Sequence, residues 1–236
     1  MTQTGSSQTS AAAAGRAIAG ALAGRRAAAL AGVVFAVLFF LGTAILNAPL
    51  NATNAELVDW WSDSGNQSTA AVSMYLFAAA ALSFLGFLTH LCARIRAAED
   101  GGQLSQLTFA SGVLFSTMLA VAAAARGVVG KAVMLNDQPL PGADTLRYLT
   151  QTASVVLGVL AMLSVTITII AVSYAIRRTG AFGRWLAWLG IIAAVAVLAV
   201  QATFAGELAI PAVLIWTVAV SAAIWRSPAG AHPAAH

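Results

Sequence analysis

Six long apolar stretches constrain this chain more than any other feature of its sequence. Each is about 18 to 28 residues long and nearly free of charge, and they cover about residues 27–46, 68–91, 104–125, 148–175, 185–204 and 208–225. A helix needs about 20 apolar residues to cross the ~30 Å hydrocarbon core of a bilayer. The runs are continuous rather than alternating, which favours helices over a β-barrel. We therefore predict an all-α bundle of six transmembrane helices.

The composition agrees with a lipid environment. The 236 residues are 60% hydrophobic and only 8% charged, whereas about a quarter of the residues in a soluble domain are charged. The net charge of +4 and the pI near 10 do not indicate nucleic acid as a partner, because the cations are dispersed and form no basic stripe. The expected partner is the lipid bilayer.

Cations are distributed unequally between the two sides of the predicted bundle. With the N-terminus inside, the inner segments contain nine cations, Arg16, Arg25, Arg26, Arg94, Arg96, Arg177, Arg178, Arg184 and Arg226. The outer segments contain three, Arg126, Lys131 and Arg147. Because cytoplasmic loops of membrane proteins are enriched in Lys and Arg, this bias predicts that both termini are cytoplasmic. The alanine richness and the scarcity of lysine favour a bacterial host, and therefore its plasma membrane.

The segment between the first two spans predicts a short interfacial helix. Thr53 and Glu56 have the spacing of a capping box at a helix start. Leu57, Trp60 and Trp61 follow at positions that share one helix face. We expect this amphipathic helix to lie at the outer interface, with its tryptophans toward lipid or protein.

Gly65 is a suitable stop for this helix, and the acids Glu56, Asp59 and Asp63 lie on its other face. The alternative is that these acids bind a cation, although their spacing matches no compact calcium loop. Trp185 and Trp188, where the fifth span begins, are predicted to act with Trp60 and Trp61 as interfacial anchors.

Charged and titratable side chains near the spans are the candidate coupling positions. Glu207 lies where the fifth and sixth spans meet, and the sequence suggests that it pairs with Arg126 or Arg147 to reduce the cost of burial. The alternative is a coupling site for a proton or charged ligand. His90, near the inner end of the second span, is either a packing residue or a proton relay.

Small and weakly polar residues form stripes on two spans. The third span carries Gly112, Ser116, Ala120, Ala123 and Gly127 at helical spacing, and the fourth carries Gln151, Ser154, Gly158, Ala161, Ser164 and Thr168. Small faces allow helices to approach closely, so we expect the second, third and fourth spans to pack together. Alternatively, Gln151, Ser154 and Thr168, together with Gln201, line a ligand cavity.

The domain division follows from these observations. Residues 1–24 are predicted to be a disordered cytoplasmic tail with some surface helix, residues 25–226 the transmembrane domain, and residues 227–236 a second disordered tail. No catalytic motif, metal-binding pattern or cofactor fingerprint is present in the sequence.

Several local motifs carry a resemblance. They are "ELVDWWSDSGNQS" from Glu56, "HLCARIR" from His90, "PLPGADTLRYL" from Pro139 and "GRWLAWLGI" from Gly183. Over about residues 27–226 the chain resembles uncharacterised actinobacterial integral membrane proteins with six predicted spans. The resemblance implies a fold and a compartment, and it brings no catalytic residues.

Three functions remain open from the sequence. The first is a non-enzymatic scaffold or accessory subunit, whose small-residue faces are filled by its own helices or by a partner, either another membrane protein or a second copy. The second is a transporter or channel for a small or lipophilic molecule, with a cavity along the fourth span. The third, an enzyme acting on lipid, needs clustered nucleophile, acid or metal groups near one interface; it is disfavoured because only the outer carboxylates come close to such a cluster.

Overall fold

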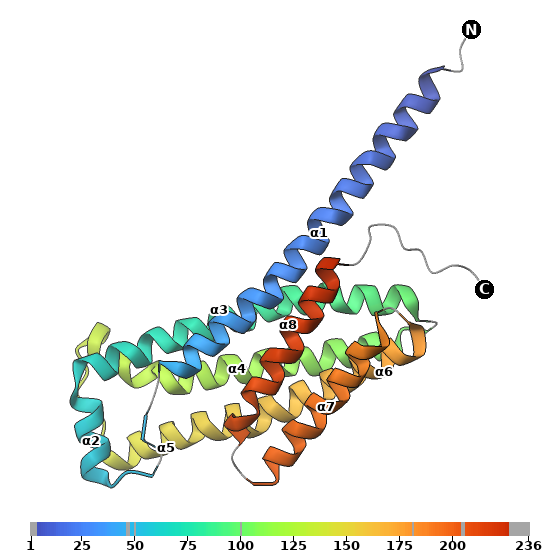
Figure 1. Ribbon diagram of the computed structural model, residues 1–236. Helices are drawn as coiled ribbons and strands as arrows, with labels where there is room; N and C mark the ends of the chain where they lie inside the picture. Colours follow the sequence, from blue (N-terminus) through green and yellow to red (C-terminus); the bar gives the residue numbers. More distant parts are fainter. Residues whose placement is uncertain are drawn as a thin grey trace.

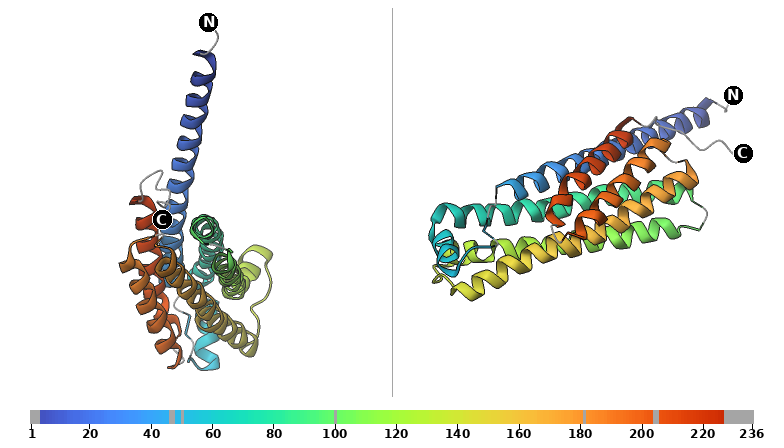
Figure 2. Two further views of the ribbon diagram at one scale, coloured as in Figure 1. Left: turned by 90° about the vertical axis from the view of Figure 1, so that its right-hand side faces the viewer. Right: turned by 60° about the horizontal axis from the view of Figure 1, so that its bottom comes forward.

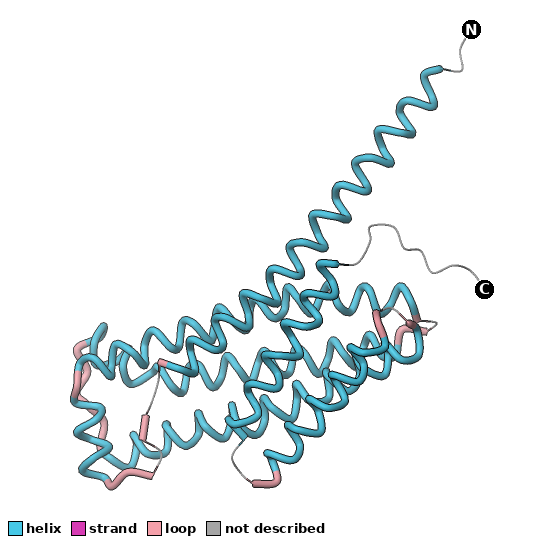
Figure 3. Tube along the Cα trace, viewed as in Figure 1, coloured by secondary structure: helices cyan, strands magenta, loops and turns pink. Residues whose placement is uncertain are grey.

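The computed structural model describes residues 4–45, 48–49, 51–99, 101–180, 182–203 and 206–226, with side chains from residue 23 onward. Every element of the described chain is a helix, and loops are confined to the ends of helices (Figure 3). This follows from the sequence, because a chain in lipid must satisfy its backbone N–H and C=O groups within each segment.

The helices follow one another with short connections (Figure 1). They are α1 (Thr4–Ala44), α2 (Asn54–Ser62), α3 (Ser64–Ala98), α4 (Gln103–Asn136), α5 (Ala143–Val155), the π-helix η1 (Val156–Ala161), α6 (Met162–Thr179), α7 (Arg184–Gln201), the 3₁₀ helix η2 (Gly206–Ala209) and α8 (Ile210–Arg226). α5, η1 and α6 form one continuous rod.

Six of the described helical segments are long and apolar enough to cross a membrane, as the sequence predicted. Three of them are much longer than the apolar stretches: α3 has 35 residues, α4 has 34 and the α5–η1–α6 rod has 37. At 1.5 Å per residue each is about 50 Å long, well beyond the ~30 Å of the hydrocarbon core. The remaining spans are shorter, and α7 has only 18 residues.

The short spans end partway along the long ones. Ser73 on α3 donates a hydrogen bond to the carbonyl oxygen of Gly42 near the end of α1, at 2.8 Å. Gln201 at the end of α7 donates to the carbonyl oxygen of Gly158 in η1. Beyond this level only α3, α4 and α5 continue, and α2 lies across their ends (Figures 1 and 2). We call residues 51–72 and 127–155 the head, and the rest of the described helices the bundle.

The head has its own hydrophobic core. Leu57 and Trp61 from α2 pack with Ala70 of α3, Val129 of α4 and Leu146 of α5. The bundle core is separate and is built largely on a phenylalanine cluster, with Phe35, Phe84 and Phe115 in mutual ring contact. Arg147 on α5 donates to the carbonyl oxygen of Ala52 and to Asn54 Oδ1, at 2.8 and 2.7 Å. It therefore holds the start of α2 against α5.

The predicted capping box is present at the start of α2. The Thr53 N–H donates to Glu56 Oε2 at 2.8 Å, and the Glu56 N–H donates to Thr53 Oγ1 at 3.3 Å. The backbone hydrogen bond from Thr53, followed by the one from its hydroxyl group, lowers the pKa of Glu56 below its ordinary value of 4.5. Trp61 is only 3% exposed and contacts protein, whereas Trp60 is half-buried. A position of α2 in the lipid interface stays a prediction.

The prediction that Gly65 stops this helix is wrong. α2 ends at Ser62, and Asp63 adopts an extended conformation with ψ of 124°. The Asp63 carboxylate accepts a hydrogen bond from the Asn66 N–H at 2.9 Å and caps α3. Asp59 and Asp63 therefore do not share a helix face, because a side-chain cap at Asp63 starts a new helix before Gly65 is reached.

Glycines bring α3 and α4 into close contact. A Cβ on Gly112 would overlap the Leu88 side chain, one on Gly127 would overlap Met74, and one on Gly130 would overlap the backbone carbonyl oxygen of Gln67. The small-residue row predicted on the third span is thus a packing face, except that Ala120 is exposed. α4 lies between α3 and α6 and packs against both.

The backbone of α1 is helical from Thr4 onward, and its first turns project away from the bundle (Figure 1). The sequence analysis allowed some surface helix within the tail predicted over residues 1–24. The predicted second tail, residues 227–236, lies outside the described residues.

Gly130→Ala tests the α3–α4 contact. The added methyl group meets a backbone carbonyl oxygen, which cannot rotate away, so we expect a loss of about 1–3 kcal/mol of stability. The matched control is Gly24→Ala, where nothing lies within 4 Å of the new Cβ. The readout is the thermal unfolding midpoint of both variants in detergent, and equal midpoints would contradict the close contact.

Candidate functional site

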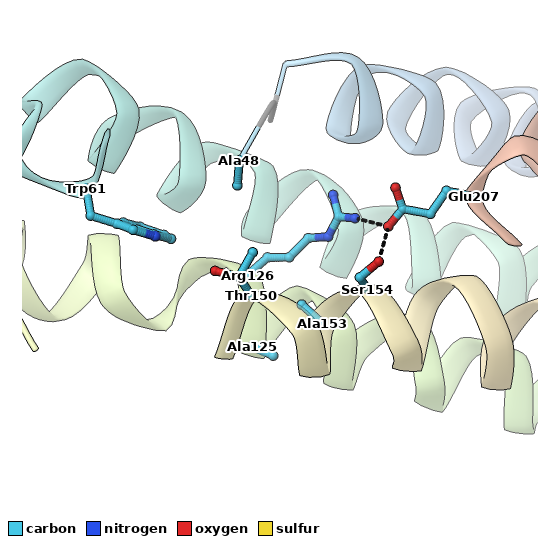
Figure 4. Close-up of a pocket in the computed structure, with 8 residues that line it drawn as sticks. All are labelled: Ala48, Trp61, Ala125, Arg126, Thr150, Ala153, Ser154 and Glu207. Atoms are coloured by element: carbon cyan, nitrogen blue, oxygen red, sulfur yellow. Dashed lines mark hydrogen bonds and ion pairs between the residues drawn. The ribbon is translucent and has the colours of Figure 1, made fainter. Parts of the chain in front are cut away.

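An ion pair of the bundle lies at its boundary with the head, and a serine of the head bonds to it. Arg126 Nη2 on α4 donates to Glu207 Oε1 in η2 at 2.9 Å. Ser154 Oγ on α5 donates to the same oxygen at 3.0 Å. The two charged side chains are only 10% and 34% exposed, respectively. The structure thus brings three of the sequence-predicted positions to one point (Figure 4), and of the two partners proposed for Glu207 it selects Arg126.

The position of Arg126 differs from the expectation that it ends its span. α4 continues for ten residues beyond Arg126, to Asn136, within the head. The Arg126 guanidinium also lies 5.3 Å from the centre of the Phe77 ring on α3. Burying a charge is costly unless it is paired and hydrogen-bonded, and Glu207 together with the ring face provides that compensation.

The turn before α8 is seated on the π-helix. Gly158 in η1 accepts the hydrogen bond from Gln201, and a Cβ on Gly206 would collide with the same Gly158 carbonyl oxygen. Gly158 itself leaves room for the Glu207 side chain, whose Cγ lies 3.5 Å from the position of a built Cβ. π-helices are rare and often mark functional sites. Here η1 sets the depth at which Glu207 meets Arg126 and Ser154.

A pocket opens beside the ion pair. It is lined by Ala48, Trp61, Ala125, Arg126, Thr150, Ala153, Ser154 and Glu207, and its cavity volume is about 50 Å³. A water molecule needs roughly 10–15 Å³ of such space, so the pocket has room for roughly three to five waters. Binding sites for organic ligands are several times larger, at about 300–1,000 Å³. We call this cavity the junction pocket.

The Trp61 indole reaches from α2 into the junction pocket, with its nitrogen on the edge facing Thr150 and Arg126 (Figure 4). Its N–H is buried and has no hydrogen-bond partner among the residues that the structure describes. From the sequence, Trp61 was predicted only as an interfacial anchor, and Thr150 was not singled out. No local pattern signals that these residues face Arg126, because the contact depends on how α2 crosses the ends of the long helices.

The other sequence-predicted positions lie elsewhere. His90 is half-buried on α3, 13 residues from Phe77 and therefore about 20 Å along the helix from the ion pair. Gln151 is exposed on α5. Thr168 is buried against α4, with its hydroxyl 2.9 Å from Ser111 Oγ. Trp185 and Trp188 on α7 are both 57% exposed, and their role as interfacial anchors stays a prediction.

No protein-family model matches the chain, and neither a curated protein nor a solved structure matches it. Within the described part of the chain, no group of three or more His, Cys, Asp or Glu side chains could hold a metal ion.

The Arg126–Glu207 pair can be tested by a double-mutant cycle. Glu207→Gln leaves the buried guanidinium without its counter-charge, and we expect a loss of about 2–3 kcal/mol of stability. Arg126→Met should cost a similar amount. The double variant should be more stable than the sum of the two losses predicts, because the charges are removed together.

The measurement is the denaturant midpoint of each variant in the same detergent. Lys131→Met is the control, because Lys131 is an exposed cation on the same helix and its loss should change the midpoint little. Additive losses in the cycle would show that the two side chains do not interact.

Proposed function

We propose that the protein is a non-enzymatic scaffold or accessory subunit of a bacterial plasma membrane, and that its head is the part that meets a partner. The six apolar helices make it a multi-pass integral membrane protein in contact with lipid. The observation that carries the proposal is the second hydrophobic core. The chain builds a separate packed unit beyond the bundle. Ser154 of this unit donates a hydrogen bond to the partly buried ion pair of the bundle, and a unit held in this way is suited to present a binding surface.

The filled interior of the bundle favours this function over transport. The stripe on the fourth span, proposed as an alternative cavity wall, is occupied by protein: Ser164 and Thr168 are buried, and Gly158 lies against the turn that carries Glu207. The junction pocket, at about 50 Å³, is too small for an organic substrate. A transporter or channel therefore remains the second candidate.

The surface of the head is acidic. Its charged side chains are Glu56, Asp59, Asp63, Asp137 and Asp144 against Lys131 and Arg147, so five negative and two positive charges give −3. All five acids are exposed. A basic surface on a partner would be attracted to the head, since complementary charge speeds encounter and sets orientation.

The proposed orientation places the head outside the cell. The cation bias supports it, because most of the arginines counted as inner lie toward the helix ends away from the head, whereas the exposed acids lie in the head. Both termini are then cytoplasmic. The resemblance to actinobacterial six-span proteins agrees with this compartment and stays a proposal.

Cysteine labelling tests the orientation. In a Cys92→Ala chain, Asp59→Cys in the head should react with a membrane-impermeant maleimide in intact cells. Arg96→Cys, at the end of α3 that lies away from the head, should react only after lysis. Both native side chains are exposed, so the comparison reports sidedness rather than burial. The reverse pattern would contradict the proposed topology.

Photo-crosslinking in the native host tests the scaffold. A photoreactive amino acid at Asp144 in the head should give one discrete protein adduct, and this adduct should weaken in high salt because exposed charges are screened. The control position is Leu82, which is 71% exposed on an apolar helix and should crosslink mainly to lipid. A head that yields no adduct, combined with substrate flux in proteoliposomes, would favour the transporter instead.

A further inference from the structure

The junction pocket contains a buried hydrogen-bond donor with no acceptor. The Trp61 side chain is 3% exposed, and its Nε1–H has no hydrogen-bond partner among the described residues. Leaving such a buried group unsatisfied is unfavourable, and an indole N–H can only donate. Whatever occupies the pocket next to Trp61 is therefore expected to present an acceptor atom.

A second wall of the pocket, formed by Arg126, also offers free donors. The Arg126 guanidinium has five N–H groups, and Nη2 is the atom that bonds Glu207. No further hydrogen bond from this guanidinium is found in the described chain. The hydroxyl protons of Thr150 and Ser154 are used on Leu146 O and Glu207 Oε1, respectively, so these two oxygens can only accept. The free donors of the pocket are therefore those of Trp61 and Arg126, and a ligand must present acceptor atoms to both.

The size and depth of the pocket further restrict which ligands can fit. Room for roughly three to five waters in about 50 Å³ matches a tetrahedral oxyanion with four oxygens. The pocket lies at the level where α1 and α7 end and where the turn before α8 is found. This level is the depth of lipid headgroups when the apolar helices occupy the hydrocarbon core.

We propose that the junction pocket binds a phosphate group. Arg126 supplies charge-assisted hydrogen bonds to the phosphate oxygens, and the Trp61 N–H supplies the neutral donor that fixes its position. The phosphate comes either from an outer phospholipid headgroup or from free phosphate, because both present the same tetrahedral oxyanion.

Glu207 sets the affinity of this site. Its Oε1 already accepts hydrogen bonds from Arg126 and Ser154, so the carboxylate neutralises the guanidinium and repels a second anion. Removing the negative charge while keeping the shape should strengthen phosphate binding, whereas removing the donor on Trp61 should weaken it. A purely structural role for these residues does not produce opposite effects on affinity.

The experiment uses the full chain labelled with 5-fluorotryptophan, in nanodiscs of a phosphate-free lipid. The fluorine NMR resonance that disappears in Trp61→Phe is assigned to Trp61 and followed during titration with inorganic phosphate. We expect that resonance to shift while the exposed Trp188, assigned through Trp188→Phe, does not respond.

Phosphate affinity is then measured by calorimetry. Trp61→Phe should bind roughly tenfold or more weakly, the ratio expected for one hydrogen bond to a charged acceptor. Glu207→Gln should bind roughly tenfold more tightly, and Trp188→Phe should match the native chain. Trp61→Phe and Trp188→Phe keep the ion pair, so the test does not depend only on a variant such as Glu207→Gln or Arg126→Gln that removes it.

A second arm distinguishes the two sources of phosphate. Native mass spectrometry of the chain released from phosphatidylglycerol nanodiscs should retain phospholipid, with less retained by Trp61→Phe, if the headgroup is the ligand. Binding of inorganic phosphate without retained lipid would identify the free anion. A Trp61 resonance that is unmoved by ~100 mM phosphate, with retained lipid equal in both chains, would overturn the proposal and leave a pocket that holds only water.

Discussion

The hydrogen bonds that Glu207 accepts from Arg126 and Ser154 are the interactions on which the arrangement of the two parts depends. Lipid tails are as apolar as the helices, so the hydrophobic effect does not by itself decide how high one span stands against another. α7 and α8 have no extension into the head. Glu207, in the turn between them, bonds Arg126 on α4 and Ser154 on α5. These polar contacts fix the short spans at one height beside the long helices that continue into the head.

Close backbone contacts reinforce the same height. The Gly158 carbonyl oxygen lies so close to Gly206 that a Cβ on Gly206 would collide with it, and Gln201 donates a hydrogen bond to the same oxygen. Within the head, Gly130 on α4 lies against the Gln67 carbonyl oxygen of α3. The junction is therefore set by backbone positions, which cannot adjust as flexible side chains do.

Sequence analysis predicted the parts of the structure that depend on local patterns. The six spans follow from apolar runs, and the capping box of Thr53 and Glu56 follows from their spacing. The pairing of Glu207 with Arg126 followed from the cost of a buried charge, with Arg147 as the alternative. The head was missed, because residues 64–69 and 143–153 are polar and become helical where α3 and α5 pack against α2 and α4. Arg147 bonds Ala52 and Asn54, a long-range contact with no local signal.

The junction pocket connects the proposed scaffold with the proposed ligand. Its walls come from both parts of the molecule, with Trp61 and Thr150 from the head and Glu207 from the turn between α7 and α8. A group that binds only when these walls are assembled stabilises the assembled state by RT ln(1 + [L]/Kd). With a lipid phosphate as the ligand, the head would be held firmly only when the bundle lies in a bilayer that supplies such headgroups. The acidic surface of the head would then be presented to a partner at a fixed height above that membrane.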